Sequence, residues 1–306
     1  MKKRLSINLT KKNAKELPNI SSGSLIVGVY EGPFTEELKI IDEVSYGQLR
    51  KLRKLGELKG KLGQGTYLPA LSGVKAQRTY LIGCGKKGKK LSRQDGIKVL
   101  SKVVSAAISS KASTTFISIP KLNISGEGDD WVIQQLAFLC ENNSYTYDAK
   151  LNKKNQKKVL LKRVSLSFNS SLSTAKLNRS IKVGLAIGRG SNAAKDLANL
   201  PGNVCTPSYL AKESRSAANK YSSLKCSVLG EKEMKKLGMD CLLSVGAGSA
   251  QESKLITLNY QGGKKGEHPH VIVGKGITFD TGGISLKPGA TMDEMKFDMC
   301  GAASVI

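Results

Sequence analysis

Four ionisable side chains near the end of the sequence have the types and spacing of a reactive site. Lys275, Asp280, Lys287 and Asp298 lie within residues 273–302, a stretch that contains six glycines. Glycines beside an acid let the backbone approach an ion closely or adopt a positive φ. Two hard carboxylates brought together can hold a divalent cation, so this stretch predicts a metal site.

The remaining features of this stretch leave more than one role open. Lys275 follows an apolar VIV run and can bind a metal only as the neutral amine, which requires burial and a nearby dication to lower its pKa strongly. The ammonium of Lys287 could polarise a carbonyl or stabilise a developing oxyanion. Asp298 begins a predicted helix, MCGAASVI, where an acid is also an ordinary partner of the helix dipole.

The order of these residues resembles a known family. VGKGITFDTGGISLKP followed by MDEMKFDMCGAAS resembles the catalytic core of the leucyl aminopeptidases, the cytosol aminopeptidase family of two-metal exopeptidases. Weaker resemblance extends upstream through AAKDLANLPGNVCTPSYLA, MKKLGMDCLLSVGAGSAQESKLITLNYQG, GELKGKLGQ and YLIGCGK. The resemblance therefore covers most of the chain.

The resemblance implies a residue-by-residue assignment. Lys275, Asp280 and Asp298 would be ligands of the second of two divalent ions, Mn²⁺ or Zn²⁺, and Asp280 would bridge to the first. Lys287 would help to hold the substrate carbonyl and the tetrahedral intermediate. Met295 falls where the family lines the pocket for the N-terminal side chain, and core packing is the alternative. The implied activity is release of N-terminal amino acids, preferably leucine, from peptides by a homo-hexamer.

One part of the family's metal centre is absent from this sequence. The family's Asn-Thr-Asp-Ala-Glu-Gly-Arg segment supplies an Asp and a Glu to the metals and an Arg that holds a bicarbonate, and the 306 residues do not contain it. Two divalent ions bring +4, whereas Asp280 and Asp298 supply −2. The sequence also ends at Ile306 within a predicted apolar helix. We therefore expect an inactive fragment of a longer reading frame, with a short natural protein that lost its activity as the alternative.

Alternating strand-like and helix-like segments must position these residues. In the first half, apolar runs predict strands, and segments with helical spacing lie between them. The predicted strands are 24–32, 79–85, 113–120 and 158–168, and the predicted helices are 35–55 with Thr35 as N-cap, 92–110 with Ser92 as N-cap, and 129–142.

A polar, serine-rich segment at 169–180 separates a second set of elements. A helix over 181–200 opens this set, and we predict a further helix at 208–223 and strands at 224–230, 253–262 and 270–276. The fold class is therefore α/β with two α/β domains. We expect an N-terminal regulatory or assembly domain over 1–168 and an incomplete catalytic aminopeptidase domain over 174–306.

The charge balance raises a second functional possibility. Forty-nine Lys and Arg against 24 Asp and Glu give a net charge of +25. The segment from Lys150 to Arg163 contains seven basic residues and no acid. Such a patch could contact DNA, as in family members that act in transcription or site-specific recombination, or could protect an edge strand from pairing. A basic solvated surface is the simpler reading of the whole charge.

Composition favours a cytoplasmic protein with no membrane segment. No apolar run approaches the length of a membrane helix, and the basic first residues lack an apolar core typical of a signal peptide. The six scattered cysteines have no CxxC pair and are expected to be reduced. His268 and His270 flank Pro269 in a turn-rich stretch, so we expect an exposed loop rather than a metal site.

Gly83, Gly85 and Gly88 have the spacing of a dinucleotide-binding fingerprint directly after a predicted strand. The fingerprint also needs an immediate helix and an acid about 20 residues later for the ribose. Lysines delay the helix here, and residues 96–125 contain no Asp or Glu. We therefore predict only a strand-to-helix loop.

Overall fold

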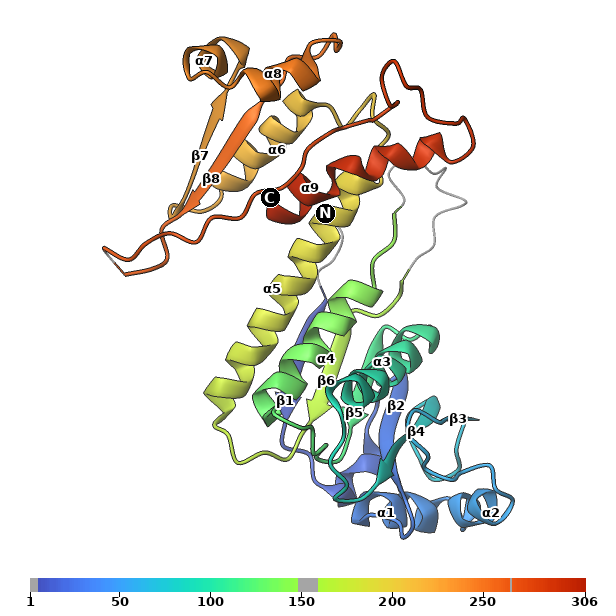
Figure 1. Cartoon of the computed structure of the whole chain (residues 1–306). Helices are drawn as coiled ribbons and strands as arrows, with labels where there is room; N and C mark the ends of the chain where they lie inside the picture. Colours follow the sequence, from blue (N-terminus) through green and yellow to red (C-terminus); the bar gives the residue numbers. More distant parts are fainter. Residues whose placement is uncertain (1–4, 148–158, 265) are drawn as a thin grey trace. The chain divides into compact units, whose positions relative to one another are not determined.

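The computed structural model describes residues 5–147, 159–264 and 266–306 (Figure 1). The chain divides into two compact units, residues 1–189 and residues 190–306. The division lies within helix α5 (Thr174–Ala198), after the boundary that the serine-rich segment suggests. Both units combine helices with a β-sheet, so the mixed α/β class is confirmed.

The first unit is built on a six-stranded sheet with the strand order β1-β6-β5-β2-β4-β3. Only β3 runs antiparallel to its neighbour, and every other described pairing in this sheet is parallel. The strands are β1 (Ser6–Thr10), β2 (Ser24–Glu31), β3 (Gly65–Pro69), β4 (Arg78–Lys86), β5 (Thr114–Ser118) and β6 (Arg163–Ser167). The sequence patterns indicated β2, β4, β5 and β6 but not β1 or β3.

Strand β2 lies inside the sheet and is buried on both faces. Ile26 belongs to one hydrophobic core, whereas Leu25 and Val27 belong to the other. Alternate side chains of a strand point to opposite faces, so a continuous apolar run is what a doubly covered parallel strand requires. This explains why SLIVGVYE contains no alternating polar positions.

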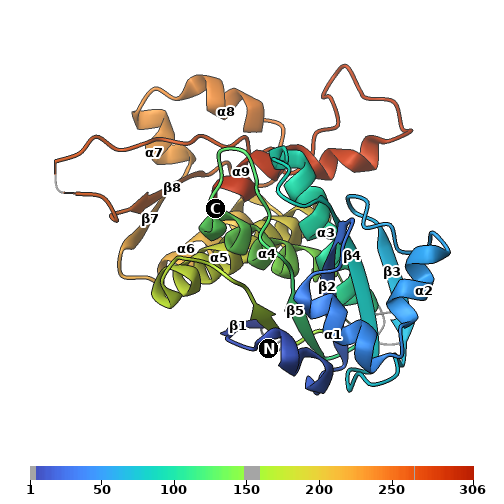
Figure 2. The same cartoon turned by 90° about the horizontal axis from the view of Figure 1, so that it is seen from below.

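Helices cover both faces of this sheet. Helices α3 (Arg93–Ser109) and α4 (Asp129–Asn143) contact each other and contribute to the first core with the beginning of α5. The 3₁₀ helix η1 (Ala14–Asn19) and helices α1 (Glu36–Val44) and α2 (Gln48–Lys54) contribute to the second core. Figure 2 shows α1 and α3 on opposite sides of the strands.

Local chemistry sets the helix ends. The backbone N–H of Asp95 donates to the Ser92 hydroxyl at 3.0 Å, which confirms the predicted N-cap of α3. Thr35 is the N-cap residue of α1, but its side chain makes no capping hydrogen bond. The predicted single helix over 35–55 is wrong, because Tyr46 and Gly47 adopt positive φ values of 56° and 75° and divide it into α1 and α2.

Helix α5 is longer than predicted. It begins at Thr174, and its buried residues Leu177, Ile181 and Leu185 belong to the core of the first unit. Gly184 permits close packing, because a Cβ at this position would lie 2.2 Å from the carbonyl oxygen of Gln134 in α4. The prediction that this helix opens the second unit is therefore wrong for its first half.

The second unit contains helix α6 (Pro207–Ala218), the antiparallel strands β7 (Leu224–Leu229) and β8 (Leu255–Tyr260), and short helices α7 (Glu231–Lys236) and α8 (Asp240–Gly246). A 3₁₀ helix, η3 (Met292–Met299), leads into α9 (Cys300–Val305). The buried core of the second unit consists of Leu197, Cys205, Leu210, Met299 and Ala303. The predictions of α6, β7 and β8 are confirmed.

Two further expectations concern basic segments and membranes. Most of the stretch from Lys150 to Arg163 lies outside the described residues, and the predicted strand at 158–168 is described as strand only over β6.

Among the helices of the described residues, none has the length and apolar character needed to span a bilayer.

Candidate metal centre

The predicted site residues lie in loops and a short helix of the second unit. Lys275, Asp280 and Lys287 belong to the segment between β8 and η3, and Asp298 is the second-last residue of η3. The strand predicted at 270–276 is wrong, because the structure gives these residues no regular secondary structure. Asp298 also precedes α9 instead of occupying its first turn.

Glycines allow the segment around Lys275 to approach α9. A Cβ on Gly274 would lie 2.4 Å from the carbonyl oxygen of Gly301. The backbone N–H of Ala302 donates to the carbonyl oxygen of Lys275 at 2.8 Å. This backbone contact brings Lys275 next to Asp298, and a side chain at position 274 would prevent it.

The four residues of the predicted site form two ion pairs in the structure. Lys275 Nζ lies 2.9 Å from Asp298 Oδ2, and Lys287 Nζ lies 2.8 Å from Asp280 Oδ2. The other oxygen of Asp280 accepts a 2.8 Å hydrogen bond from the backbone N–H of Gly282. The N–H of Lys287 donates to the carbonyl oxygen of Thr281 at 2.9 Å, so the chain turns back and returns Lys287 to Asp280.

Gly282 is required for this turn. Its φ is +92°, and a Cβ would lie 2.4 Å from the carbonyl oxygen of Ser285. Sequence reasoning recognised that glycines after Asp280 give conformational freedom, but it did not assign the Gly282 N–H as a donor to that carboxylate. The adjacent sequence Asp-Thr-Gly was the available signal, since Asp side chains commonly accept from the backbone two residues later.

The charges of the cluster act on one another. The Asp298 carboxylate is the main cause that raises the pKa of Lys275, and Asp280 adds to it. The Lys287 side chain is the main cause that lowers the pKa of Asp280, followed by the Gly282 N–H. Without a metal ion, Lys275 is therefore a charged ammonium, and a role as neutral ligand requires that a bound dication displace its proton.

The donor set fits part of a metal site. Oδ2 of Asp298 is buried and has no hydrogen-bond partner among the described residues, although the Lys275 ammonium lies close to it. Such an acceptor suits a divalent cation. Across residues 5–147, 159–264 and 266–306, no group of three or more His, Cys, Asp or Glu side chains could hold a metal ion. The two carboxylates of Asp280 and Asp298 balance the charge of one divalent cation. The charge of a second divalent cation would stay uncompensated.

Other candidates from the sequence have clear positions. Met295 is half-buried in η3, whereas Met299 is the methionine that enters the core. The role of Met295 in substrate binding stays a prediction. His268 and His270 are exposed in irregular chain, as expected for a loop. All six cysteines lie in the described residues and are free thiols.

Comparison with known proteins gives a consistent family for both units. The model of the cytosol aminopeptidase family, catalytic domain, matches residues 192–306, and that of the cytosol aminopeptidase family, N-terminal domain, matches residues 26–154. A probable cytosol aminopeptidase of Alkalilimnicola ehrlichii is 41% identical over 293 residues, which are 95% of this chain and 59% of the relative. That of Thioalkalivibrio sulfidiphilus is 40% identical and covers 93% of this chain and 58% of the relative.

Solved structures share the fold. A tomato leucine aminopeptidase variant matches with a TM-score of 0.78 at 23% identity, over 98% of this chain and 57% of that one. The bottromycin maturation enzyme BotP in complex with Mn matches with a TM-score of 0.68 at 23% identity, over 92% and 54%. The chain thus spans less than three fifths of the length of these relatives. Two matched domain models that together cover most of its residues show that it belongs to the cytosol aminopeptidase family.

Proposed function

We propose that this chain supplies the N-terminal unit and part of the metal centre of a metal-dependent aminopeptidase that releases N-terminal residues, preferably leucine, from peptides. The observation that supports this best is the convergence of Lys275 with Asp298 and of Lys287 with Asp280 inside the segment matched by the catalytic-domain model. Family membership supports the reaction class, and the paired charges support the choice of residues.

The proposed roles follow from the donor chemistry. Asp280, Asp298 and the neutral amine of Lys275 would hold a divalent cation, Mn²⁺ or Zn²⁺. The cation would supply Lewis-acid polarisation of the scissile carbonyl and activation of the attacking water. Lys287 is about one-third exposed and would donate to the substrate carbonyl oxygen and to the oxyanion that develops on it. Met295 would line the pocket for the substrate's first side chain.

A complete two-metal centre needs more carboxylates than Asp280 and Asp298 supply. The family resemblance places them in the Asn-Thr-Asp-Ala-Glu-Gly-Arg segment, together with the Arg for a bicarbonate. We therefore propose that the 306-residue chain does not turn over substrate alone, and that a longer protein containing that segment does. A homo-hexamer and a cytoplasmic location are part of the same proposal.

Manganese titration tests the site without relying on activity. We expect calorimetry to show Mn²⁺ binding to the 306-residue chain that Asp280→Asn or Asp298→Asn weakens at least about tenfold, since each removes one charged ligand. Glu252→Gln, which removes another exposed carboxylate of the same unit, is the matched control and should leave binding unchanged. Equal weakening by all three substitutions would reduce the site to general charge attraction.

Leucyl amide hydrolysis tests the reaction. With Mn²⁺, the 306-residue chain should show no turnover above its Lys287→Ala variant. A longer protein with the additional metal-binding segment should show turnover that a chelator abolishes. Chelator-insensitive turnover, or none at all in the longer protein, would contradict the proposed aminopeptidase function.

DNA binding is a second candidate, favoured by the net charge of +25. Electrophoretic mobility shifts over a salt series test it. Specific binding would fall steeply with salt, and replacement of the lysines in the segment from Lys150 to Arg163 would weaken it. Weak binding without sequence preference would leave only a basic surface.

A further inference from the structure

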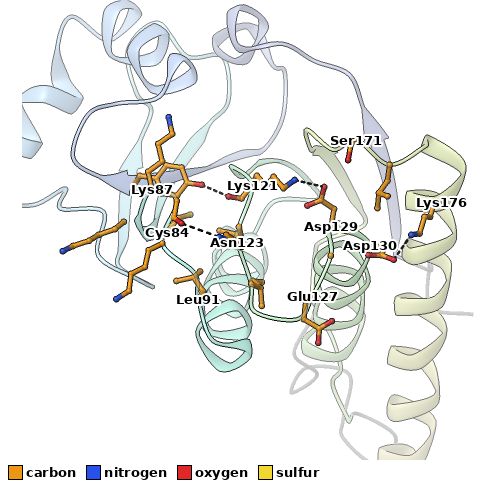
Figure 3. Close-up of a pocket in the computed structure, with 18 residues that line it drawn as sticks. Cys84, Lys87, Leu91, Lys121, Asn123, Glu127, Asp129, Asp130, Ser171 and Lys176 are labelled. Carbon is orange, nitrogen blue, oxygen red and sulfur yellow. Dashed lines mark hydrogen bonds and ion pairs between the residues drawn. The ribbon is translucent and has the colours of Figure 1, made fainter.

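A pocket of about 780 Å³ in the first unit lies where the carboxyl ends of the parallel strands meet (Figure 3). Its walls come from the ends of β2 and β4, from the loop after β5, and from the beginnings of α4 and α5. Its size is within the range of small-molecule sites. All of its lining residues belong to the first unit, so it is separate from the candidate metal centre.

The topology of the sheet favours ligand binding at this place. β2 and β5 are parallel neighbours, but the chain leaves them in opposite directions. After β2 it continues to β3 and β4 on one side, whereas after β5 it continues through α4 to β6 on the other. Open α/β sheets characteristically bind ligands in the crevice at such a switch point.

The acids that line the pocket are already neutralised. Each of the three has a cationic partner: Asp129 with Lys121 at 3.7 Å, Asp130 with Lys176 at 3.2 Å, and Glu127 with Arg93 at 3.1 Å. Asp129 also accepts a 2.7 Å hydrogen bond from the Ser170 hydroxyl. Figure 3 shows the pairs of Asp129 and Asp130 on the side of the pocket opposite Lys87. These acids therefore contribute little net negative field.

The lysines after β4 are different. Lys86, Lys87 and Lys89 line the pocket and are exposed, and none has a carboxylate within ion-pair distance in the described part of the chain. Within the described part of the chain, the backbone N–H groups of Lys87 and Gly88 also lack a hydrogen-bond acceptor. Unpaired ammonium and amide groups in one tight loop form an anion-binding environment.

The glycine spacing in this loop has two explanations. A Cβ on Gly83 would lie 1.9 Å from the carbonyl oxygen of Lys61, so Gly83 is required by packing within the protein. Gly88 has a φ of +76° and open space where a Cβ would lie. A Cβ on Gly85 would lie 3.2 Å from the side chain of Leu62, so of the three glycines only Gly88 is free to face a ligand. This agrees with the absence of a complete dinucleotide fingerprint.

The other wall of the pocket is apolar. Leu91, Leu122 and Ile124 line it and are buried members of the first core. The Tyr30 hydroxyl donates to the carbonyl oxygen of Lys121 at 2.6 Å and holds this loop in place. Burial raises the pKa of Cys84 to about 12, so its thiol stays neutral and is not a nucleophile. The pocket is suited to binding rather than covalent chemistry.

We propose that this pocket binds a small molecule with a phosphate group and an apolar or aromatic portion. The loop containing Lys86, Lys87, Gly88 and Lys89 receives the phosphate, and the wall of Leu91, Leu122 and Ile124 contacts the remainder. This function is additional to the aminopeptidase site and does not depend on it.

Calorimetric titration of the 306-residue chain with ADP and with inorganic pyrophosphate tests the proposal. We expect saturable binding of one ADP, and weaker binding of pyrophosphate because it lacks the portion that contacts the apolar wall. A triple variant, Lys86→Gln, Lys87→Gln and Lys89→Gln, should weaken ADP binding at least about tenfold through loss of charge-assisted hydrogen bonds. Fluorescence of Trp131, the single tryptophan, verifies that the variant is folded.

A second triple variant controls for charge. Lys39→Gln, Lys51→Gln and Lys54→Gln removes the same charge from exposed positions of α1 and α2 and should leave ADP binding unchanged. Equal losses in both triple variants, or no saturable binding of either probe at millimolar concentration, would overturn the proposal. Lys287→Ala should not affect ADP binding, which separates this site from the proposed aminopeptidase site.

Discussion

Two segments of similar sequence adopt different structures in this molecule: one is a buried strand and the other is exposed and irregular. Strand β2 contains Leu25 to Val29, LIVGV, and residues 270–276 read HVIVGKG. Leu25 and Ile26 are fully buried and pair with strands on both sides. Ile272 is 74% exposed, and its segment has no regular secondary structure. An apolar β-branched run therefore becomes a strand only when another strand satisfies its backbone hydrogen-bonding groups.

The physical reason is the backbone. A strand cannot satisfy its own N–H and C=O groups, so its stability depends on a neighbour. β4 and β5 provide two neighbours for β2, and helices then cover both faces. No described residue forms a ladder with 270–276. Strand propensity is thus mostly a preference for a pleated, packed environment.

Hydrogen exchange should give the largest contrast between these segments. Amides of β2 should exchange at least about 1,000-fold more slowly than those of 271–273, because an opening free energy of about 4 kcal/mol or more protects a core strand. Exchange resolved by mass spectrometry or NMR measures this. Comparable protection of both segments would mean that residues 271–273 pair with another part of the chain.

Truncation of one isoleucine in each segment should give the next largest contrast. Ile26→Ala should lower the free energy of unfolding of the first unit by about 3 kcal/mol, since it leaves a cavity in a packed core. Ile272→Ala should change stability by less than about 0.5 kcal/mol.

Urea unfolding measures this pair of variants. Trp131 fluorescence follows the first unit, and circular dichroism follows both. If Ile272→Ala destabilised the protein as much as Ile26→Ala, the exposed segment would have to be packed in solution.

Removal of a surface ion pair should have the smallest effect, and the effect should be the same in the two units. Lys176 is the main cause that lowers the pKa of Asp130 in the first unit, and Lys254 is the main cause that lowers the pKa of Glu252 in the second. Lys176→Ala and Lys254→Ala should therefore each raise the pKa of the partner acid, measured by carboxyl NMR titration. Neither should shift the urea midpoint measurably at pH 7, because exposed pairs are screened.

The pH dependence of these pairs has a definite sign. A pKa of Asp130 or Glu252 that is lowered in the folded state stabilises the protein at pH above the unfolded pKa, and this gain is lost as pH falls through the folded pKa. Any loss of stability in the Lys176→Ala and Lys254→Ala variants should therefore be confined to pH above the unfolded pKa, and it should disappear in acid, below the folded pKa. A difference that persists in acid would show that the lysine acts through packing instead.

The candidate metal centre likewise depends partly on local sequence and partly on contacts between distant residues. Residue types, glycines and spacing were enough to select Lys275, Asp280, Lys287 and Asp298. The pairing of Lys275 with Asp298 depends on the approach of Gly274 to Gly301, 27 positions apart in the sequence. The protonated state of Lys275 also follows from this contact, whereas the sequence pattern suggested the neutral amine of a metal-bound state.

Local patterns were enough to predict the α/β class, most elements of the first unit, the N-cap of α3 and the residues of the candidate metal centre, because periodicity, capping chemistry and motif spacing do not depend on distant contacts. Long-range contacts set which apolar runs became strands, where α5 divides between two cores and which lysines lack a carboxylate partner among the described residues. Each of these depends on which distant residues come together, and local preference does not specify that.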